Sequence, residues 1–231
     1  MSEYCELKKQ ISTTIPRSAA LATKSFRLGQ FKLSSGGTSD YYLDCRTTTL
    51  DARGAQLTGQ VFLNEICTRG WNVQAIGGLT LGADPIVVAV AVTSGTMHGF
   101  LVRKAEKQHG TGQRIEGFRE KGARVVIVDD VCTTGASTIQ AIEAAREFGF
   151  TIEGVMCLVE RQEAGGRASV EKAAAPALFV SIFTASDVRR EHMSQTNGMA
   201  NAAHVVSVTC ELCGHPAVTN TPRNRCAEHK A

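Results

Sequence analysis

Hydrophobic and polar residues alternate in blocks along most of the chain. Short apolar runs rich in Val and Ile, typical of buried strands, alternate with longer segments that have the spacing of amphipathic helices. This rhythm predicts an α/β fold with a mostly parallel central sheet flanked by helices. The predicted strands are 73–78, 99–104, 123–130, 151–161 and 178–183, and the predicted helices among them are 84–92 and 137–149.

The pattern before this core is different. Residues 3–27 contain two amphipathic segments, and residues 31–44 have the alternation of a β-hairpin around a Gly-Gly turn. Asp51 suits the N-cap of a helix over 51–69, and Gly70 suits its end. The sequence therefore predicts a hairpin and a helix ahead of the repeating strands.

The pattern changes again near the C-terminus. Residues 189–204 are polar and low in apolar content, as a linker or a frayed helix would be, and a cysteine-rich tail follows. A boundary near residue 200 is predicted, which divides the chain into a domain over 1–200 and a small zinc-ribbon-like tail over 201–231.

Composition adds constraints on location. No apolar run reaches the roughly 18 residues of a membrane span, and the N-terminus lacks the order of a signal peptide. The formal net charge of +3 is a global average and gives weak evidence for a polyanionic partner. Five scattered cysteines indicate reduced thiols and a cytoplasmic protein without a membrane anchor: Cys5, Cys45, Cys67, Cys132 and Cys157.

Ligands of parallel α/β sheets sit at the carboxyl ends of the strands. The most informative end is "VVIVDDVCTTGAST", residues 125–138, where a buried strand stops at Asp129 and Asp130. These carboxylates suit vicinal hydroxyls or a magnesium ion. The turn at Gly135 and the helix start beyond it suit a phosphate, together with the hydroxyls of Thr133, Thr134, Ser137 and Thr138. A sugar phosphate satisfies both halves; the alternative is an N-capped helix with solvated acids.

Three other strand ends are weaker. The stretch 103–117 is basic and glycine-rich, so it could fold over a diphosphate, although alone it fits a solvated charged loop at least as well. Arg161 ends another strand, where it could grip a carboxylate or a carbonyl-rich ring, or pair with Glu160 or Glu163. The stretch 77–85 has glycines that allow close ligand approach, and a plain turn fits it equally.

Together these strand ends resemble the type I phosphoribosyltransferases, whose signature of apolar strand, two acids and a T-T-G-x-S/T turn is matched by residues 125–138. Three stretches resemble the orotate phosphoribosyltransferase family in particular: "LSSGGTSDYYLD" at 33–44, "RKAEKQHG" at 103–110 and "VERQEAG" at 159–165. The resemblance runs from about residue 15 to residue 187. It implies the type I phosphoribosyltransferase fold with an N-terminal hairpin that hoods the base.

The resemblance implies a role for each matching residue. Asp129 and Asp130 would hold the ribose 2- and 3-hydroxyls of 5-phosphoribosyl pyrophosphate (PRPP), and Arg161 would meet the orotate ring. The residues that would wrap the 5-phosphate of PRPP are Val131, Cys132, Thr133, Thr134, Gly135, Ala136 and Ser137, of which Thr133 would also touch orotate. Tyr41 and Tyr42 match the hood over the base.

The basic stretch matches the family's mobile catalytic loop, which reaches into the partner subunit's site and so implies a homodimer. Arg103, Lys104, Lys107 and His109 match its cations. With Asp129 and Asp130, the last three of these would be the catalytic residues. The implied reaction is Mg²⁺-dependent transfer of phosphoribosyl from PRPP to orotate in pyrimidine (UMP) biosynthesis, giving orotidine 5'-phosphate and pyrophosphate.

The chain departs from the family at two points. Many relatives have a lysine beside the Ser-Gly of the hairpin, where this chain has residues 34–38 without one, and some have a lysine in the loop "LTLGADP", which also lacks one here. Two alternatives stay open: transfer to another base, purine or uracil, and a PRPP-sensing regulator that binds nucleic acid. The tail has no aromatic residue to stack on a base, which argues against the regulator.

The C-terminal tail has its own pattern. Its spacing C-x2-C-x12-C-x2-H predicts a structural, tetrahedral Zn²⁺ site, formed by Cys210, Cys213, Cys226 and His229. Such a short segment cannot bury a core of its own, so metal binding would supply its folding energy. The alternative is an unstructured tail with incidental thiols.

Overall fold

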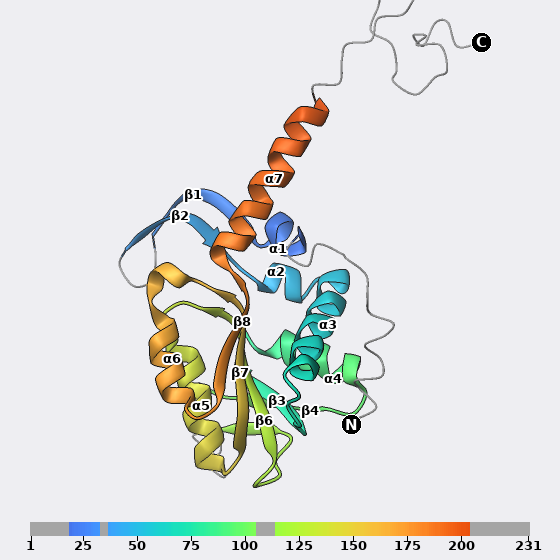
Figure 1. Ribbon diagram of the computed structural model, residues 1–231, viewed down its shortest axis with the longest axis vertical. Coiled ribbons are helices and arrows are strands. Elements are labelled where there is room, and N and C mark those ends of the chain that lie inside the picture. The colour runs from blue at the N-terminus through green and yellow to red at the C-terminus, as the bar shows by residue number, and fades with distance from the viewer. Residues whose placement is uncertain (1–18, 33–36, 105–113, 204–231) are drawn as a thin grey trace, which may run out of the picture. The chain divides into compact units, whose positions relative to one another are not determined.

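The structure, a computed structural model, describes residues 19–32, 37–104 and 114–203 (Figure 1). The chain divides into two compact units, Met1–Glu191 and His192–Ala231. Of the second unit, the structure describes the end of helix α7 (Ala185–Ala203). The predicted loop residues Lys107 and His109 lie outside the described residues. So do the predicted zinc ligands Cys210, Cys213, Cys226 and His229.

The first unit is built on a six-stranded sheet in the order β5-β4-β3-β6-β7-β8. All neighbouring strands pair in parallel except the edge strand β5, which is antiparallel to β4. The predicted mostly parallel sheet is therefore confirmed. Its strands are β3 (Ala75–Leu79), β4 (His98–Val102), β5 (Ile115–Gly117), β6 (Arg124–Cys132), β7 (Thr151–Glu160) and β8 (Leu178–Thr184).

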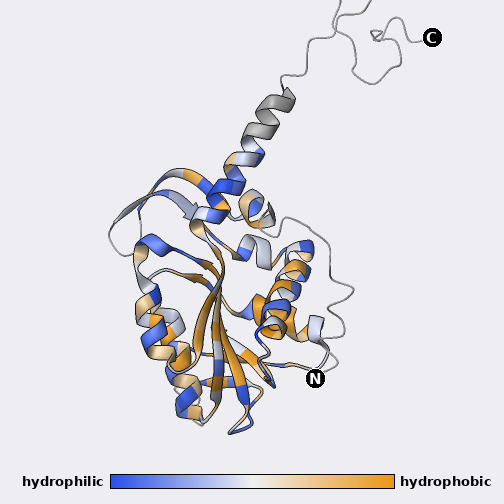
Figure 2. Cartoon of the chain, viewed as in Figure 1, coloured by the Kyte–Doolittle hydropathy of each residue, from blue (hydrophilic) through white to orange (hydrophobic). Residues whose placement is uncertain are grey.

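Helices cover both faces of this sheet. Figure 1 shows α3 (Ala52–Thr68) and α4 (Asp84–Ser94) on one side of it, and α5 (Ala136–Phe148) and α6 (Gly166–Ala174) on the other. Hydrophobic residues concentrate in the strands and in the helix faces turned toward them (Figure 2). The resulting three-layer arrangement is the one that the alternating strands and helices of the sequence predict.

Strand β6 explains why its sequence is apolar without interruption. Val126 and Val128 belong to the core cluster under α3 and α4, whereas Val125 and Ile127 belong to the cluster under α5 and α6. Successive side chains of a strand point to opposite faces, so a strand covered on both sides needs apolar residues at every position. The run ends at Asp129, where the strand reaches the carboxyl edge of the sheet.

The N-terminal part forms a separate two-stranded sheet. Strand β1 (Phe26–Lys32) pairs antiparallel with β2 (Thr38–Leu43), which confirms the predicted hairpin. Helix α1 (Ala19–Lys24) precedes the hairpin, and helix α2 (Arg46–Thr49) follows it. The prediction of an amphipathic segment up to residue 27 ran too far, because Phe26 already stands in a strand, stacked on Tyr41 with ring centroids 5.2 Å apart.

Strand β5 and helices α2 and α6 were not predicted from the sequence, and one element was left open. Strand β5 has only three residues, too few to show a periodicity. Helix α6 buries little apart from Val170 and Ala174, so its apolar stripe is faint. Of the two alternatives for residues 189–204, the helical one holds through Ala203. The N-cap of α3 is confirmed, since the Asp51 carboxylate accepts a hydrogen bond from the Gly54 amide at 2.9 Å. None of the helices within the described ranges is long and apolar enough to cross a membrane.

Candidate active site

A cavity of about 330 Å³ opens at the carboxyl ends of β3 and β6. It brings together residues from the hairpin, from the end of β4 and from the turn before α5. Eight of its lining residues were predicted from the sequence as site residues: Tyr42, Lys104, Asp129, Asp130, Val131, Thr133, Ser137 and Arg161. Seven others were not: Leu43, Asp44, Arg46, Leu79, Thr80, Leu81 and Gly82.

Asp129 is the more buried of the two adjacent acids, with 5 % of its surface exposed. One carboxylate oxygen accepts a hydrogen bond from the Asp130 amide at 3.0 Å, and the other accepts one from the Thr138 hydroxyl at 2.7 Å. Burial, together with the charge of the nearby Asp130, raises the pKa of Asp129 to about 7. The strand tip therefore holds a carboxyl group whose ionisation is unfavourable until a partner arrives.

Asp130 faces the cavity beside the loop that follows β3. Its carboxylate accepts a hydrogen bond from the Val131 amide at 2.9 Å. Burial raises the pKa of Asp130, and the charge of Arg46 opposes that shift. A Cβ atom at Gly82 would lie 2.3 Å from the Asp130 carboxylate oxygen, so any side chain there would displace that carboxylate. The loop Thr80–Gly82 thus lies directly against this acid.

The turn after β6 depends on Gly135. This residue has φ +81°, and a Cβ there would meet Val170 of α6 at 2.4 Å. Helix α5 begins at the next residue, so its first amides are available at the turn, where an anion is stabilised. Thr133 and Ser137 line the cavity, whereas Cys132 is fully buried and its thiol contacts Cys157.

Arg161 sits at the end of β7 with 9 % of its surface exposed. Its Nε donates to the Tyr41 hydroxyl at 2.9 Å and to Glu163 at 3.1 Å, and its Nη2 donates to the Ser39 hydroxyl at 3.1 Å. The guanidinium also lies over the Tyr41 ring, 4.5 Å from its centroid. The pairing with Glu163, one of the alternatives for this arginine, is therefore present, and the same arginine lines the cavity.

The hairpin contributes its two adjacent tyrosines to different surroundings. Tyr42 lines the cavity, and the side chain of Tyr41 is buried on the opposite face of β2. Burial, together with the hydrogen bond that its hydroxyl donates to Glu163, raises the pKa of Tyr41 to about 12. Tyr41 therefore stays protonated and ties the hairpin to the end of β7.

Basic residues approach from the end of β4. Lys104 lines the cavity, and its carbonyl accepts a hydrogen bond from Gln140 at 3.4 Å. Arg103 is paired with Glu116 of β5 at 3.3 Å, and both side chains are exposed. Of the four predicted loop cations, the described part of the chain thus brings Lys104 to the cavity.

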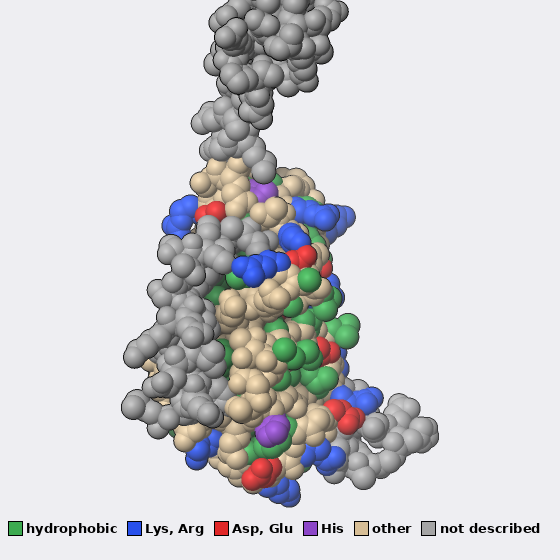
Figure 3. Space-filling model, turned by 90° about the vertical axis from the view of Figure 1, so that its right-hand side faces the viewer, with side chains coloured by type: hydrophobic (Ala, Val, Ile, Leu, Met, Phe, Trp, Pro, Cys, Tyr) green, Lys and Arg blue, Asp and Glu red, His purple; other side chains and the backbone are tan. Residues whose placement is uncertain are grey.

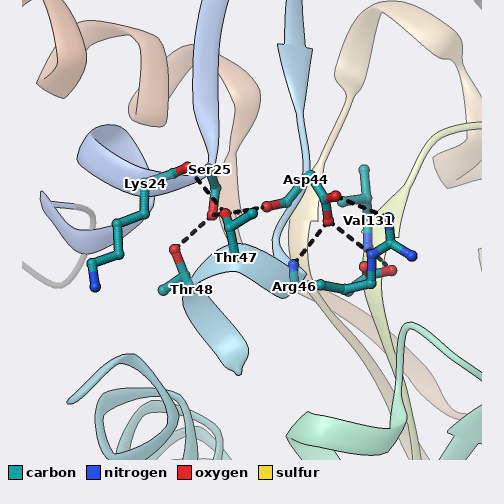
Figure 4. Close-up of polar contacts among 8 residues, drawn as sticks. Lys24, Ser25, Asp44, Arg46, Thr47, Thr48 and Val131 are labelled. Carbon is teal, nitrogen blue, oxygen red and sulfur yellow. Dashed lines mark hydrogen bonds and ion pairs between the residues drawn. The ribbon is translucent and has the colours of Figure 1, made fainter. Parts of the chain in front are cut away.

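The pair Asp44 and Arg46 is the main feature that sequence reasoning missed. Figure 4 shows the two side chains together, with Val131 of the β6 end beside them. The signal was available, because "DCR" directly follows the hairpin strand that carries the two tyrosines. Without knowledge of how the hairpin packs on the sheet, however, an acid and a base two residues apart suggest only a local ion pair.

These observations define the class of the protein. A parallel sheet with two adjacent carboxylates at a central strand end, a hydroxyl-rich turn leading into a helix, and a hairpin at the same edge make up the type I phosphoribosyltransferase fold. No protein-family model matches the chain, but curated relatives do. The chain belongs to the orotate phosphoribosyltransferase family.

That membership rests on close relatives. The chain is 42 % identical over 162 residues to an orotate phosphoribosyltransferase of Aquifex aeolicus, covering 68 % of this chain and 86 % of the relative. It is 38 % identical over 165 residues to one of Rhodopirellula baltica, with the same coverage of both chains. A crystal structure of Mycobacterium tuberculosis orotate phosphoribosyltransferase with Fe(III) dicitrate is similar at a TM-score of 0.65 and 35 % identity, covering 75 % of this chain and 99 % of that one.

Proposed function

We propose that the chain transfers the 5-phosphoribosyl group of PRPP to orotate, releasing pyrophosphate and forming orotidine 5'-phosphate, a step of pyrimidine biosynthesis. This proposal rests on the observation that the Asp129–Asp130 pair and Arg161 line the same cavity. One side suits a ribose phosphate and the other suits an anionic, carbonyl-rich ring. A crystal structure of the Mycobacterium tuberculosis relative was determined with PRPP, and this chain is 32 % identical to it at a TM-score of 0.62.

PRPP would bind along the β6 end. The carboxylates of Asp129 and Asp130 accept hydrogen bonds from the ribose hydroxyls, which relieves the unfavourable burial of two neighbouring acids. The turn over 131–137 receives the 5-phosphate through its backbone amides and the hydroxyls of Thr133 and Ser137. The first turn of α5 adds the partial positive charge of a helix N-terminus.

Orotate would bind between Arg161 and the hairpin. The guanidinium is held by Ser39, Tyr41 and Glu163, so it can meet the orotate ring or its carboxylate without losing side-chain freedom on binding. Tyr42 and Thr133 line the same cavity and would cover the ring. Orotate carries its negative charge on the carboxylate, which gives the site a group by which to position the ring.

The reaction exchanges one bond at the ribose anomeric carbon. The bond from this carbon to the diphosphate oxygen breaks with its electron pair leaving on pyrophosphate, and the orotate ring nitrogen donates the pair for the new bond. The proton of that nitrogen passes to the departing pyrophosphate or to water. Positive charge builds on the ribose in the transition state, as in other glycosyl transfers. Arg103, Lys104, Lys107 and His109 of the basic loop would neutralise the departing diphosphate.

Mg²⁺ fits this site as an ion that would be coordinated mainly by oxygens of the bound substrate. The described residues contain no group of three or more His, Cys, Asp or Glu arranged to hold a metal. Magnesium commonly takes one or two protein carboxylates and fills its shell with phosphate oxygens and water. Asp130, at the cavity, would hold it. When bound, the ion supplies charge that stabilises the leaving diphosphate.

A direct assay tests the proposal. The purified protein is given PRPP and Mg²⁺ with orotate, adenine, hypoxanthine or uracil, and pyrophosphate release is measured. Release with orotate, and with none of the other three bases, supports the proposed function. No release with orotate, or faster release with another base, would overturn it.

We also propose a homodimer formed through α4. Val88 and Val92 are 60 % and 77 % exposed, and they lie four residues apart on one face of this helix. Figure 3, which views the side that carries α3 and α4, shows hydrophobic side chains gathered on the surface. A second copy of the chain, placed here, would cover this apolar face.

The dimer has a simple test. Val92→Glu should convert the protein from dimer to monomer in analytical ultracentrifugation, because a carboxylate would be buried without a partner at the interface. Leu178→Glu is the matched control, since Leu178 is 59 % exposed on a different element. A wild-type protein that sediments as a monomer, or a Val92→Glu variant that stays dimeric, would contradict this interface.

For the C-terminal tail we propose a structural zinc site formed by Cys210, Cys213, Cys226 and His229, supported by the spacing of these residues. Metal analysis of the purified protein should find about one zinc per chain. The Cys213→Ser and Cys226→Ser variants should lose it, and Cys67→Ser should keep it. Zinc near zero in the wild type would remove the site. Cys45, Cys132 and Cys157 are buried thiols outside any disulfide, which supports the proposal of a reducing, cytoplasmic location.

A further inference from the structure

The cavity has an unassigned cation. Three basic side chains line it among the described residues: Arg46, Lys104 and Arg161. The guanidinium of Arg161 is held toward the hairpin by its hydrogen bonds to Ser39, Tyr41 and Glu163. Lys104 begins the basic loop. Arg46 has no role in the site described so far, although it stands at the first position of α2 with its side chain in the cavity wall.

Arg46 is held in a fixed orientation. Its Nε and Nη2 each donate a hydrogen bond to one carboxylate oxygen of Asp44, both at 2.9 Å, which makes a two-bond fork. The Arg46 amide donates to the same carboxylate at 3.1 Å, so Asp44 orients both the backbone and the guanidinium. The third guanidinium nitrogen, Nη1, makes no hydrogen bond to any described residue. Figure 4 shows the guanidinium turned back beneath Asp44, toward Val131.

The neighbours of Arg46 place it at one part of the site. Its charge acts on Asp130, opposing the raised pKa of that acid. Asp130 in turn lies against Gly82 of the loop Thr80–Gly82. This loop lines the same cavity and contains no basic residue. The arginine from α2 therefore provides positive charge at a loop that has none of its own.

We propose that Arg46 binds the diphosphate group of PRPP, and of pyrophosphate in the reverse reaction, with Asp44 as its positioning residue. A guanidinium fixed at two nitrogens and available at the third is suited to one strong, directional bond to a phosphate oxygen. The inference rests on the proposed phosphoribosyl transfer and adds a residue to it. It also explains how the loop Thr80–Gly82 can lack a lysine.

Ribose 5-phosphate separates this role from a general effect on the site, because it has the hydroxyls and the 5-phosphate but no diphosphate. In Arg46→Gln, the KM values for PRPP and for pyrophosphate should rise about tenfold or more. The KM for orotate and the inhibition constant of ribose 5-phosphate should stay within about twofold. Arg46→Lys keeps the positive charge but cannot form the two-bond fork. Its KM values for PRPP and pyrophosphate should therefore lie between those of the wild type and those of Arg46→Gln.

A second substitution tests whether charge at this place is what matters. Leu81 lines the cavity on the loop and is exposed. Adding Leu81→Lys to Arg46→Gln should lower the KM for pyrophosphate again, and Leu81→Gln in the same background should not. Arg53→Gln, on the exposed surface of α3, controls for the loss of an arginine elsewhere.

The outcomes are distinguishable. If the wild type fails to convert orotate and PRPP, the proposed function fails before Arg46 is considered. If the wild type is active and Arg46→Gln keeps its KM for pyrophosphate, or weakens ribose 5-phosphate equally, Arg46 is only a structural partner of Asp44. Should Arg46→Gln not fold, the comparison of Arg46→Lys with and without Leu81→Lys decides in the same way.

Discussion

Replacing Asp129 and Asp130 together with asparagine should lower kcat/KM for PRPP by at least about 10³-fold and leave the protein folded. The two carboxylates are the groups proposed to hold the ribose hydroxyls and to offset the positive charge that develops on the sugar. Asparagine keeps the shape and can still accept from the Asp130 amide and pair with the Thr138 hydroxyl, so the strand end should not collapse.

Stability should respond in the opposite direction from activity. The folded-state pKa of Asp129, about 7, lies above its ordinary value of 3.8. The stability that this group contributes is therefore present below its unfolded pKa and is lost as the pH rises through 7. At pH 8 the asparagine variant should melt no lower than the wild type. The exposed double variant Glu143→Gln with Glu147→Gln is the control, and unimpaired turnover in the aspartate variant would refute the assignment.

The second large effect is expected at Arg161. Arg161→Lys should reduce kcat/KM for orotate by about 10²-fold, with a much smaller change in the KM for PRPP. Lysine has one nitrogen, which cannot reach Tyr41, Glu163 and Ser39 as the fork does, so the cation would lose its fixed direction. Steady-state kinetics with each substrate varied in turn measure the split.

Two comparisons make the Arg161 experiment specific. Tyr41→Phe removes the hydroxyl that accepts the hydrogen bond from Arg161 Nε, but it keeps the ring that stacks on Phe26. This variant should therefore raise the KM for orotate about tenfold. Arg69→Lys changes an exposed arginine that forms its own ion pair with Glu65 and should have no effect. An equal loss for orotate and PRPP in Arg161→Lys would indicate general damage to the site instead of base recognition.

The sequence was sufficient to predict a helix or strand when the residues that define it lie within one short segment. Strand β6 shows continuous apolar residues, then two acids, then a turn and a helix, in the predicted order, although the strand continues two residues past the acids to Cys132. Helix α3 is equally local, because Asp51 caps it. The short strand β5 and the faintly apolar α6 gave no comparable signal, since three residues show no period and small side chains show little amphipathicity.

The site could be predicted only in part for a related reason. Asp129, Asp130 and Arg161 stand at strand ends, and the geometry of parallel sheets brings such ends to one edge. The contribution of Arg46 depends on how the hairpin and α2 pack on that edge, which no local pattern encodes. The same holds for the clamp on Arg161, whose partners Ser39 and Tyr41 are more than 100 residues away in the sequence.

The contact between α6 and the turn proposed to bind the 5-phosphate has a consequence for synthesis of the chain. A Cβ at Gly166 would lie 2.3 Å from the Thr133 carbonyl oxygen, and Gly135 meets Val170, so the turn is shaped against a helix about thirty residues further on. A nascent polypeptide that ends before Gly166 would already contain both acids and the whole turn. It would lack the surface that supports them, and affinity for PRPP would emerge only after translation had passed α6.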